Sequence, residues 1–363
     1  MNCMSMDSGA RADRAALPVL AVLLPCCLLF PLAGVLLTGQ PLADYLHFPP
    51  LTQQVEHAPW NGAVFLAGLL VLLPVLACLA GTMIRRWRPV SGSGEHGFPW
   101  WGSAGLVLVA ISWILAWNRF PWFRGWQAYT FTPLWLGYIL VVNGLVHKWT
   151  GTSLPERNLR GFLILFPASA LFWWYFEYLN RFVQNWYYLG IETFSSQAYV
   201  LHATVCFSTV LPAVEGTREL LEAWQQPVGR RQPPGRQPQW IGWLLLLTSM
   251  AGLAGLAAWP DLLFPLVWVS PFTILAGIQG VRDGRICPVL TGWPALATPA
   301  LAGLVCGFFW EMWNWKSLAH WEYAIPWVDR YHLFAMPLLG YGGYLPFGAG
   351  CCCLARLVTG RSA

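Results

Sequence analysis

Charged residues are scarce in this sequence. Asp, Glu, Lys and Arg make up 10% of its 363 residues, whereas hydrophobic residues make up 56%. A soluble domain carries roughly 25% charged residues. The composition therefore excludes an ordinary soluble domain, places the chain in the membrane class, and gives no reason to expect a nucleic-acid partner.

Short motifs of catalysis and cofactor binding are also missing. The 10 cysteines form no C-x-x-C pair and no Cys/His cluster with zinc spacing. Most lie in or beside apolar runs, where Cys behaves as a small hydrophobic residue. No phosphate-binding loop, nucleotide fingerprint or hydrolase motif occurs. We therefore expect neither a metal site nor a cofactor.

Lysine is nearly absent as well. Among the 21 basic residues only Lys148 and Lys316 are lysines, and no Asn-x-Ser/Thr sequon occurs. An arginine-rich basic set without sequons is typical of proteins from GC-rich bacterial genomes. We therefore expect a multi-pass protein of the cell membrane, in a bacterium the inner membrane.

Ten apolar runs approach the roughly 20 residues that a helix needs to cross the hydrocarbon core. The first is read as a retained span, although it resembles a signal peptide. The fold prediction is thus an all-α polytopic integral membrane protein with about ten transmembrane helices. The expected spans are Leu17–Leu37, Asn61–Ile84, Trp101–Trp117, Phe131–His147, Gly161–Asn180, Ala198–Val214, Trp240–Trp259, Leu262–Gly280, Thr291–Trp313 and His332–Ala355.

The best internal boundary is the Pro/Gly/Arg-rich stretch at residues 225–239, expected to be a cytoplasmic linker. It separates residues 100–224 from residues 240–356, and residues 1–90 form an N-terminal two-helix segment. With the N-terminus inside, 16 of the 21 basic residues fall on the inner side. This bias predicts that both termini face the cytoplasm.

One motif, Glu-x-x-Asn followed by Trp-x-Tyr, occurs twice. The two copies are separated by about 134 residues, and further Trp, Gly and Pro residues match at nearly the same separation. We therefore predict two parallel four-helix repeats related by an axis along the membrane normal. The motif residues are Glu177, Asn180, Trp186 and Tyr188 in the first copy and Glu311, Asn314, Trp321 and Tyr323 in the second.

The two glutamates are the candidate acid/base pair, because ionisable side chains within spans mark functional sites. Glu177 lies about 24 Å along a helix that begins at Gly161, near the extracytoplasmic end of the span. Arg181 is spaced to pair with Glu177 on one helix face, whereas Trp315 takes its place in the second copy. One carboxyl could then stay ionised while Glu311 carries a proton.

The remaining motif residues have two interpretations each. Asn180 and Asn314 belong either to the catalytic set or to helix caps. The two Trp-x-Tyr pairs either contact substrate or form an interfacial aromatic belt. His202 is a proton relay, a haem ligand, or a satisfied histidine of the core or lumen.

Three functional classes remain open at this stage. The first is a protein that binds or converts a lipid or isoprenoid substrate by acid/base chemistry, with aromatic walls that hold an apolar chain or stabilise a cation. The second is a transporter or flippase with its site between the repeats. The third is an assembly subunit without chemistry. Membrane lipids are the expected partners in every case.

Overall fold

The computed structural model describes residues 25, 28–50, 52–87, 96–225, 238–283, 290 and 292–359. Helices dominate the described residues, and they are joined by short 3-10 turns and two small two-stranded sheets. The long helices are α2 (Gly62–Arg86), α3 (Trp100–Trp117), α4 (Phe131–Thr150), α6 (Leu159–Val183), α7 (Ser196–Phe207), α8 (Val210–Ala223), α9 (Gln239–Gly255), α11 (Pro265–Asp283), α12 (Trp293–Asn314) and α13 (Tyr344–Thr359).

The shorter elements connect these helices. They are η1 (Leu42–Tyr45), η2 (Pro121–Tyr129), α5 (Leu154–Arg157), α10 (Pro260–Leu263) and η4 (Leu338–Gly343), with strands β1 (Trp186–Leu189), β2 (His320–Tyr323), β3 (His332–Leu333) and β4 (Met336–Pro337).

Six helical segments of the described chain are long and apolar enough to cross a membrane, or seven if the bent pair formed by η2 and α4 counts as one span. The six segments are α2, α3, α6, α12, the consecutive α7 and α8, and the consecutive η4 and α13. This finding indicates an integral membrane protein.

The prediction of ten spans is not confirmed. Within the described residues, Leu28–Leu37, α9 and most of α11 are shorter apolar helices of 10–17 residues. α9 ends at Gly255, and Pro260 and Pro265 begin new helices shortly afterwards, since proline removes a backbone donor and favours the first helical turn. The expected span at 332–355 begins with β3 and β4 instead, and residues 17–24 lie outside the described residues.

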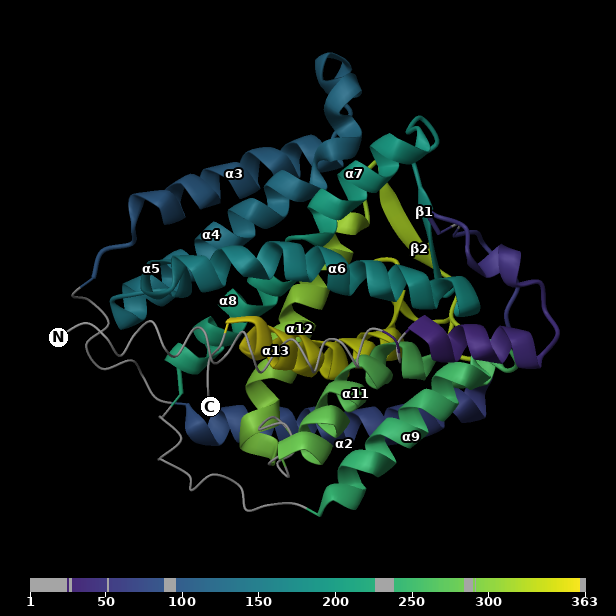
Figure 1. Cartoon of the computed structure of the whole chain (residues 1–363). Helices are drawn as coiled ribbons and strands as arrows, with labels where there is room; N and C mark the ends of the chain where they lie inside the picture. Colours follow the sequence, from purple (N-terminus) through teal and green to yellow (C-terminus); the bar gives the residue numbers. More distant parts are fainter. Residues whose placement is uncertain are drawn as a thin grey trace.

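Two pairs of neighbouring helices pack backbone to backbone. α3 lies beside α4 (Figure 1), and α9 lies against α11. A Cβ atom added to Gly105 would lie 2.9 Å from the Gly137 carbonyl oxygen, and one added to Gly242 would lie 2.9 Å from that of Gly277. Such close approach is typical of helix pairs in membranes, where small residues replace hydrophobic driving force with van der Waals packing.

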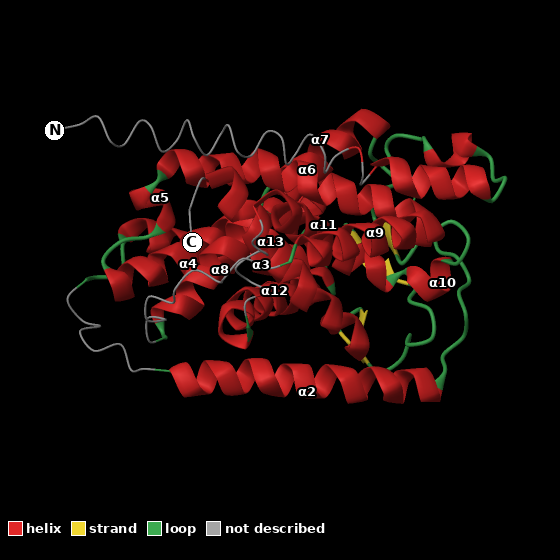
Figure 2. Ribbon diagram, turned by 60° about the horizontal axis from the view of Figure 1, so that its bottom comes forward, coloured by secondary structure: helices red, strands yellow, loops and turns green. Residues whose placement is uncertain are grey.

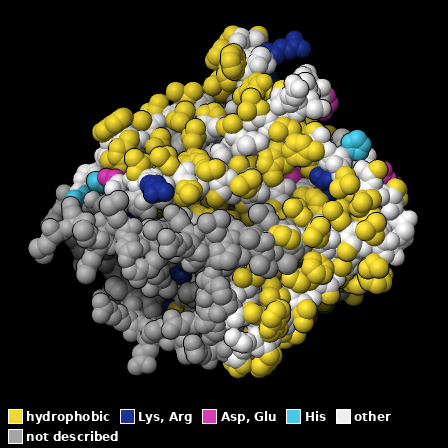
Figure 3. Space-filling view, viewed as in Figure 1, with side chains coloured by type: hydrophobic (Ala, Val, Ile, Leu, Met, Phe, Trp, Pro, Cys, Tyr) yellow, Lys and Arg dark blue, Asp and Glu magenta, His cyan; other side chains and the backbone are white. Residues whose placement is uncertain are grey.

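The outer surface is apolar. On α2, Leu70 is 67% exposed and Val71 is 69% exposed, and this helix runs along one side of the molecule (Figure 2). The space-filling view shows hydrophobic side chains over most of the described face, with few charged ones (Figure 3). An apolar surface of this extent marks contact with a membrane or with other proteins.

The core is built from aromatic side chains of α4, α6, α12 and α13. Trp135, Phe176 and Phe347 are at most 1% exposed. Trp135 of α4 lies 4.9 Å from Trp310 of α12 between ring centroids. Segments far apart in the sequence therefore share one core.

The two copies of the Trp-x-Tyr sequence form the two strands of one sheet. β1 pairs antiparallel with β2, so that Trp186 lies opposite Tyr323 and Tyr188 lies opposite Trp321. Each strand directly follows the helix that carries the glutamate of its own copy, α6 for β1 and α12 for β2. No strand is expected here from the sequence, and the pairing brings the two motifs into contact.

Candidate functional site

Each motif asparagine fixes the turn from its helix to its strand. Asn180 Nδ2 donates to the Trp186 carbonyl at 2.7 Å, and its Oδ1 accepts from the Asn185 N–H at 2.8 Å. Asn314 makes the corresponding bonds to the Trp321 carbonyl and N–H, at 2.7 and 2.8 Å. Both side chains are at most 2% exposed. The asparagines therefore position the strands and do not themselves face a ligand.

Glu177 is buried and accepts three hydrogen bonds on one oxygen. Its side chain is 1% exposed, and Oε1 accepts from the Tyr188 hydroxyl at 2.6 Å and from the indoles of Trp173 and Trp186 at 3.0 and 3.1 Å. Two of these donors come from the motif's own Trp-x-Tyr pair. The spacing of the motif thus closes a local network of carboxyl, indole and hydroxyl.

Arg181 does not form the ion pair with Glu177 that its spacing allows. Its guanidinium donates to the carbonyl of Tyr45 in η1 and lies 5.1 Å from the Tyr178 ring centroid. Among the described residues no ion pair joins Arg181 to Glu177. The helix rotates the arginine toward η1, so the expected difference between the two copies does not arise from a salt bridge.

Glu311 has a different set of donors. It is 0% exposed, and its Oε1 accepts from the hydroxyls of Tyr323 and Tyr344, both at 2.6 Å. The indole of Trp321 donates to the Tyr323 hydroxyl at 2.7 Å. Within the part of the chain that the structure describes, Oε2 of Glu311 is buried without a hydrogen-bond partner.

A cavity of about 100 Å³ lies between the two motifs. All four motif aromatics line it, Trp186 and Tyr188 from β1 and Trp321 and Tyr323 from β2. The wall also contains Trp173, Tyr199, His202, Phe207, Trp268, Trp310 and Tyr344. The carboxyls of Glu177 and Glu311 lie behind this wall, each one hydrogen bond away from a tyrosine hydroxyl that faces it.

The aromatic pairs do not form an interfacial belt as a set. Trp186 is only 3% exposed, whereas a belt residue sits at the surface between lipid and water. Tyr188, Trp321 and Tyr323 are half-buried. The other interpretation, that they contact a ligand, stays a prediction.

His202 lies on the same wall but is not joined to the carboxyls. Its ring stacks on Phe194 with centroids 5.4 Å apart, and its Nε2 lies 3.6 Å from the Cys206 sulfur. Among the described residues it has no hydrogen bond to either glutamate. The structure therefore brings His202 to the cavity as a wall residue.

Several wall residues were missed by the sequence analysis. Tyr344 was not among the predicted site residues, yet its hydroxyl donates to Glu311 from the first residue of α13. Trp268 and Trp310 lie on α11 and α12. One signal in the sequence could have identified Trp268, because it matches Trp135 at the separation of the two repeats.

At the edge of the sheet, Tyr187 and Glu322 are opposite each other. The Tyr187 hydroxyl donates to Glu322 Oε2 at 2.8 Å. Burial, with this hydrogen bond to the carboxylate, raises the pKa of Tyr187 to about 12. This side-chain hydrogen bond joins β1 to β2 in addition to the backbone hydrogen bonds of the sheet.

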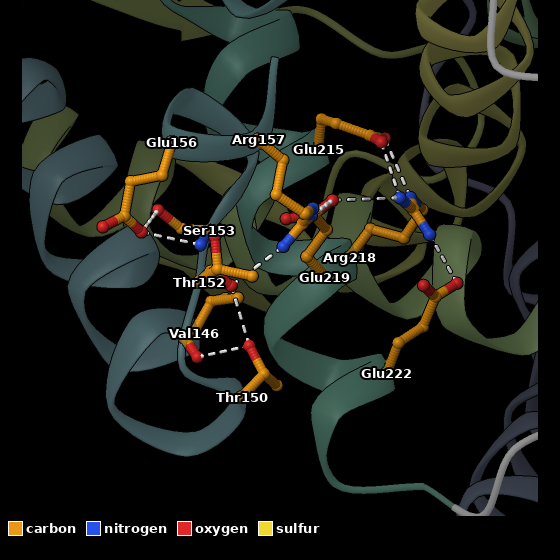
Figure 4. Close-up of polar contacts among 10 residues, drawn as sticks. All are labelled: Val146, Thr150, Thr152, Ser153, Glu156, Arg157, Glu215, Arg218, Glu219 and Glu222. Atoms are coloured by element: carbon orange, nitrogen blue, oxygen red, sulfur yellow. Dashed lines mark hydrogen bonds and ion pairs between the residues drawn. The ribbon is translucent and has the colours of Figure 1, made fainter. Parts of the chain in front are cut away.

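A second charged cluster lies on α8, away from the cavity wall (Figure 4). Arg218 is 6% exposed and donates to both oxygens of Glu215, at 2.6 and 2.8 Å. It also pairs with Glu222 at 2.5 Å, and Arg157 of α5 pairs with Glu219 at 2.6 Å. This network joins α8 to the connection between α4 and α6.

Metal-ligand sets are not found in the described chain: no group of three or more His, Cys, Asp or Glu side chains could hold an ion there. Among the described cysteines, Cys78, Cys206, Cys306, Cys351 and Cys352 are free thiols, and Cys353 is disulfide-bonded.

Comparison with known proteins gives no relative from which a role could be transferred. No protein-family model, no curated protein and no solved structure matches the chain.

Proposed function

We propose that this chain is a multi-pass membrane protein that binds a lipid or isoprenoid ligand in the cavity between the two motifs and acts on it by acid/base chemistry. One observation carries the proposal. Both Trp-x-Tyr pairs line one cavity, and the tyrosine of each pair holds a buried glutamate one hydrogen bond behind the wall.

The walls suit an apolar ligand. Most lining side chains are aromatic or aliphatic, and burial of apolar surface contributes roughly 25 cal/mol per Å². A volume of about 100 Å³ accommodates one end or one small group, because an engineered apolar cavity of about 150 Å³ holds benzene. The rest of a long ligand would extend through the open side toward the lipid.

The hydroxyls provide a route for a proton. Tyr188 and Tyr323 each stand between a buried carboxyl and the cavity, with O–O distances of 2.6 Å. Because each tyrosine donates to its glutamate, the carboxylate can take the tyrosine's proton while the tyrosine oxygen takes a proton from a ligand in the cavity. Proton transfer by a positioned group of this kind contributes typically 10²–10⁴-fold to a rate.

The two carboxyls differ in their donors. Glu177 accepts from one hydroxyl and two indoles, whereas Glu311 accepts from two hydroxyls. The sequence predicted that the two copies differ through an ion pair between Arg181 and Glu177. The two carboxyls differ instead in their hydrogen-bond donors. We assign the proton-accepting role to Glu311, because both of the hydroxyls that donate to it line the cavity.

The proposal includes an origin of the two motifs in repeated halves, residues 100–224 and 240–356. Two contacts that cross between the halves support it. Trp135 packs on Trp310 at 4.9 Å, and its counterpart Trp268 packs on Phe176, the counterpart of Trp310, at 5.4 Å. The strand register has the same reciprocity, as a two-fold axis would require.

The orientation also remains part of the proposal. The arginine distribution favours cytoplasmic termini and a cytoplasmic linker at residues 225–239. The cavity would then lie near the extracytoplasmic face, in a bacterium on the outer side of the inner membrane.

The proposal is tested by separate Glu177→Gln and Glu311→Gln variants in a deletion strain, with the protein level followed alongside the lipid extract. We expect normal abundance and an accumulated unconverted lipid for at least Glu311→Gln. A deletion strain whose extract matches the wild type would contradict conversion, and an altered distribution between leaflets without a new lipid would favour transport.

A further inference from the structure

We propose that the group recognised inside the cavity is a monocation without N–H donors, of the quaternary-ammonium type. This inference rests on the proposed function, because it names the ligand chemistry of the same cavity. Three independent features of the wall point to it: its aromatic rings, the state of its hydroxyls, and the charge behind it.

The rings form a continuous part of the wall. Trp186 lies 5.5 Å from Trp268, which lies 6.4 Å from Tyr344; Tyr344 lies 5.9 Å from Trp310, and Trp310 lies 6.3 Å from Trp173. Each ring carries negative potential on its face, and indole attracts cations best. Aromatic cages of this kind bind quaternary ammonium groups and methylated lysine.

The hydroxyls are oriented to accept. Tyr188 donates its proton to Glu177, and Tyr323 and Tyr344 donate theirs to Glu311, each at 2.6 Å. Distances of 2.5–2.7 Å are typical of O–H···O⁻ bonds to an ionised acceptor. Lone pairs of the Tyr188 and Tyr344 oxygens are then left for the ligand, whereas the Tyr323 oxygen accepts from the Trp321 indole. These lone pairs favour positive charge over an anionic group.

Some of the indole donors are also turned away from a ligand. Trp173 and Trp186 donate to Glu177, and Trp321 donates to the Tyr323 hydroxyl. A phosphate or carboxylate in the cavity would lose these donors. Such an anion would therefore pay for its desolvation without recovering hydrogen bonds.

The charge behind the wall is negative. Glu177 and Glu311 are at most 1% exposed, and no Lys or Arg is among the residues that line the cavity. Arg181 is directed to the Tyr45 carbonyl. Oε2 of Glu311 is buried with no partner among the described residues, so that carboxylate lacks full compensation. A bound monocation would supply it.

The size of the cavity and the strong hydration of a primary ammonium favour a quaternary ammonium as the ligand. The cavity of about 100 Å³ takes one small head and no chain. A primary ammonium is a compact, strongly hydrated charge that needs three acceptors of its own. A tetraalkylammonium keeps apolar contact with every ring while it carries the charge.

The test uses the full chain purified in a neutral detergent, with binding of choline measured by quenching of tryptophan fluorescence and by calorimetry. The neutral isostere 3,3-dimethylbutan-1-ol, in which carbon replaces nitrogen, is titrated in parallel. We expect choline to bind about tenfold more tightly, equivalent to about 1.4 kcal/mol, because the ring faces attract the cation and not its neutral isostere. Geraniol serves as the isoprenoid probe.

Matched variants separate charge from shape. Glu311→Gln should weaken choline binding about tenfold and leave the isostere unchanged, whereas Glu192→Gln, on an exposed loop side chain, should change neither. Equal binding of choline and its isostere, with geraniol bound, would overturn the cation assignment and leave the proposed function standing. Failure of all three probes to bind would overturn both.

One further titration distinguishes the two sources of the cation, a lipid headgroup and a small soluble amine. Tighter binding of dodecylphosphocholine than of choline assigns the group to a lipid head, in support of the lipid ligand. Equal or weaker binding assigns it to a small soluble amine, which keeps the cation assignment and overturns the lipid as its source.

Discussion

Trp186 and Tyr323 lie opposite each other in one two-stranded sheet, although they belong to different copies of the motif. Tyr188 and Trp321 form the reciprocal pair. The sheet therefore places both aromatic pairs on one cavity wall, and each tyrosine holds the glutamate of its own copy. The cavity depends on this register, because a slip of one residue would turn each side chain to the other face.

The asparagines should control the geometry of the strands. Asn180→Ala removes the acceptor for two strand N–H groups and leaves them buried, which costs about 1–3 kcal/mol of unfolding free energy. The expected result is a lower midpoint of thermal unfolding in detergent, with Asn314→Ala behaving alike. Asn118 is exposed and bonds only one helix carbonyl, so Asn118→Ala is the control. An equal midpoint in all three variants would refute the positioning role.

The buried cluster on α8 should be a major stabilising contact. Arg218→Met removes the arginine that donates to both oxygens of the buried Glu215, and the loss of one partner of a buried pair costs about 3–5 kcal/mol. Arg157→Met is the matched control, since the Arg157 side chain is 37% exposed and a solvated pair contributes about 1 kcal/mol or less. Thermal unfolding compares the two, and a larger loss for Arg157→Met would contradict this account.

Arg181 should be separable from the chemistry of Glu177. Because its guanidinium bonds to the Tyr45 carbonyl, Arg181→Gln should loosen η1 and leave ligand binding in the cavity within about twofold of wild type. Limited proteolysis near residues 40–50 reports the first effect and probe titration the second. A loss of binding as large as that of Glu177→Gln would show that the arginine acts through the carboxyl after all.

The Tyr187–Glu322 pair gives a prediction for pH. The pKa of Tyr187 is raised to about 12 by burial and by Glu322. The neutral tyrosine therefore stabilises the fold below pH 10, and this contribution is lost as the pH rises through about 12. Glu322→Gln should lower the pKa but keep it above 10, because burial remains.

Absorbance titration of tyrosinate, as the difference from Tyr187→Phe, measures this pKa. An unchanged value in Glu322→Gln would mean that burial alone causes the shift.

Much of the helical fold could be predicted, because long apolar runs depend only on local composition. α2, α3, α4, α6 and α12 lie close to the expected spans. Ten spans are not shown in the described residues: Pro260 and Pro265 begin new helices after α9, and α9 and most of α11 are shorter apolar helices of 10–17 residues. Apolar composition alone does not record where a helix ends.

The candidate site was predicted in its residues but not in its assembly. Glu177, Glu311 and the two Trp-x-Tyr pairs stood out because they are repeated. Their pairing into β1 and β2 joins segments more than 130 residues apart, and each strand has only four residues, too few for a periodic signal. The partner of Arg181 was missed for the same reason, since Tyr45 lies 136 residues away.

The central claim is that the cavity between the motifs holds a ligand. Ala203 of α7 lines it and is 6% exposed, whereas Leu201 on the same helix is 70% exposed. Ala203→Phe fills the cavity, and Leu201→Phe changes only the outer surface. The most direct measurement is mass spectrometry of small molecules that remain bound to the purified wild type and to both variants. We predict a retained ligand in the wild type and in Leu201→Phe and its loss in Ala203→Phe; equal retention in all three proteins would contradict the claim.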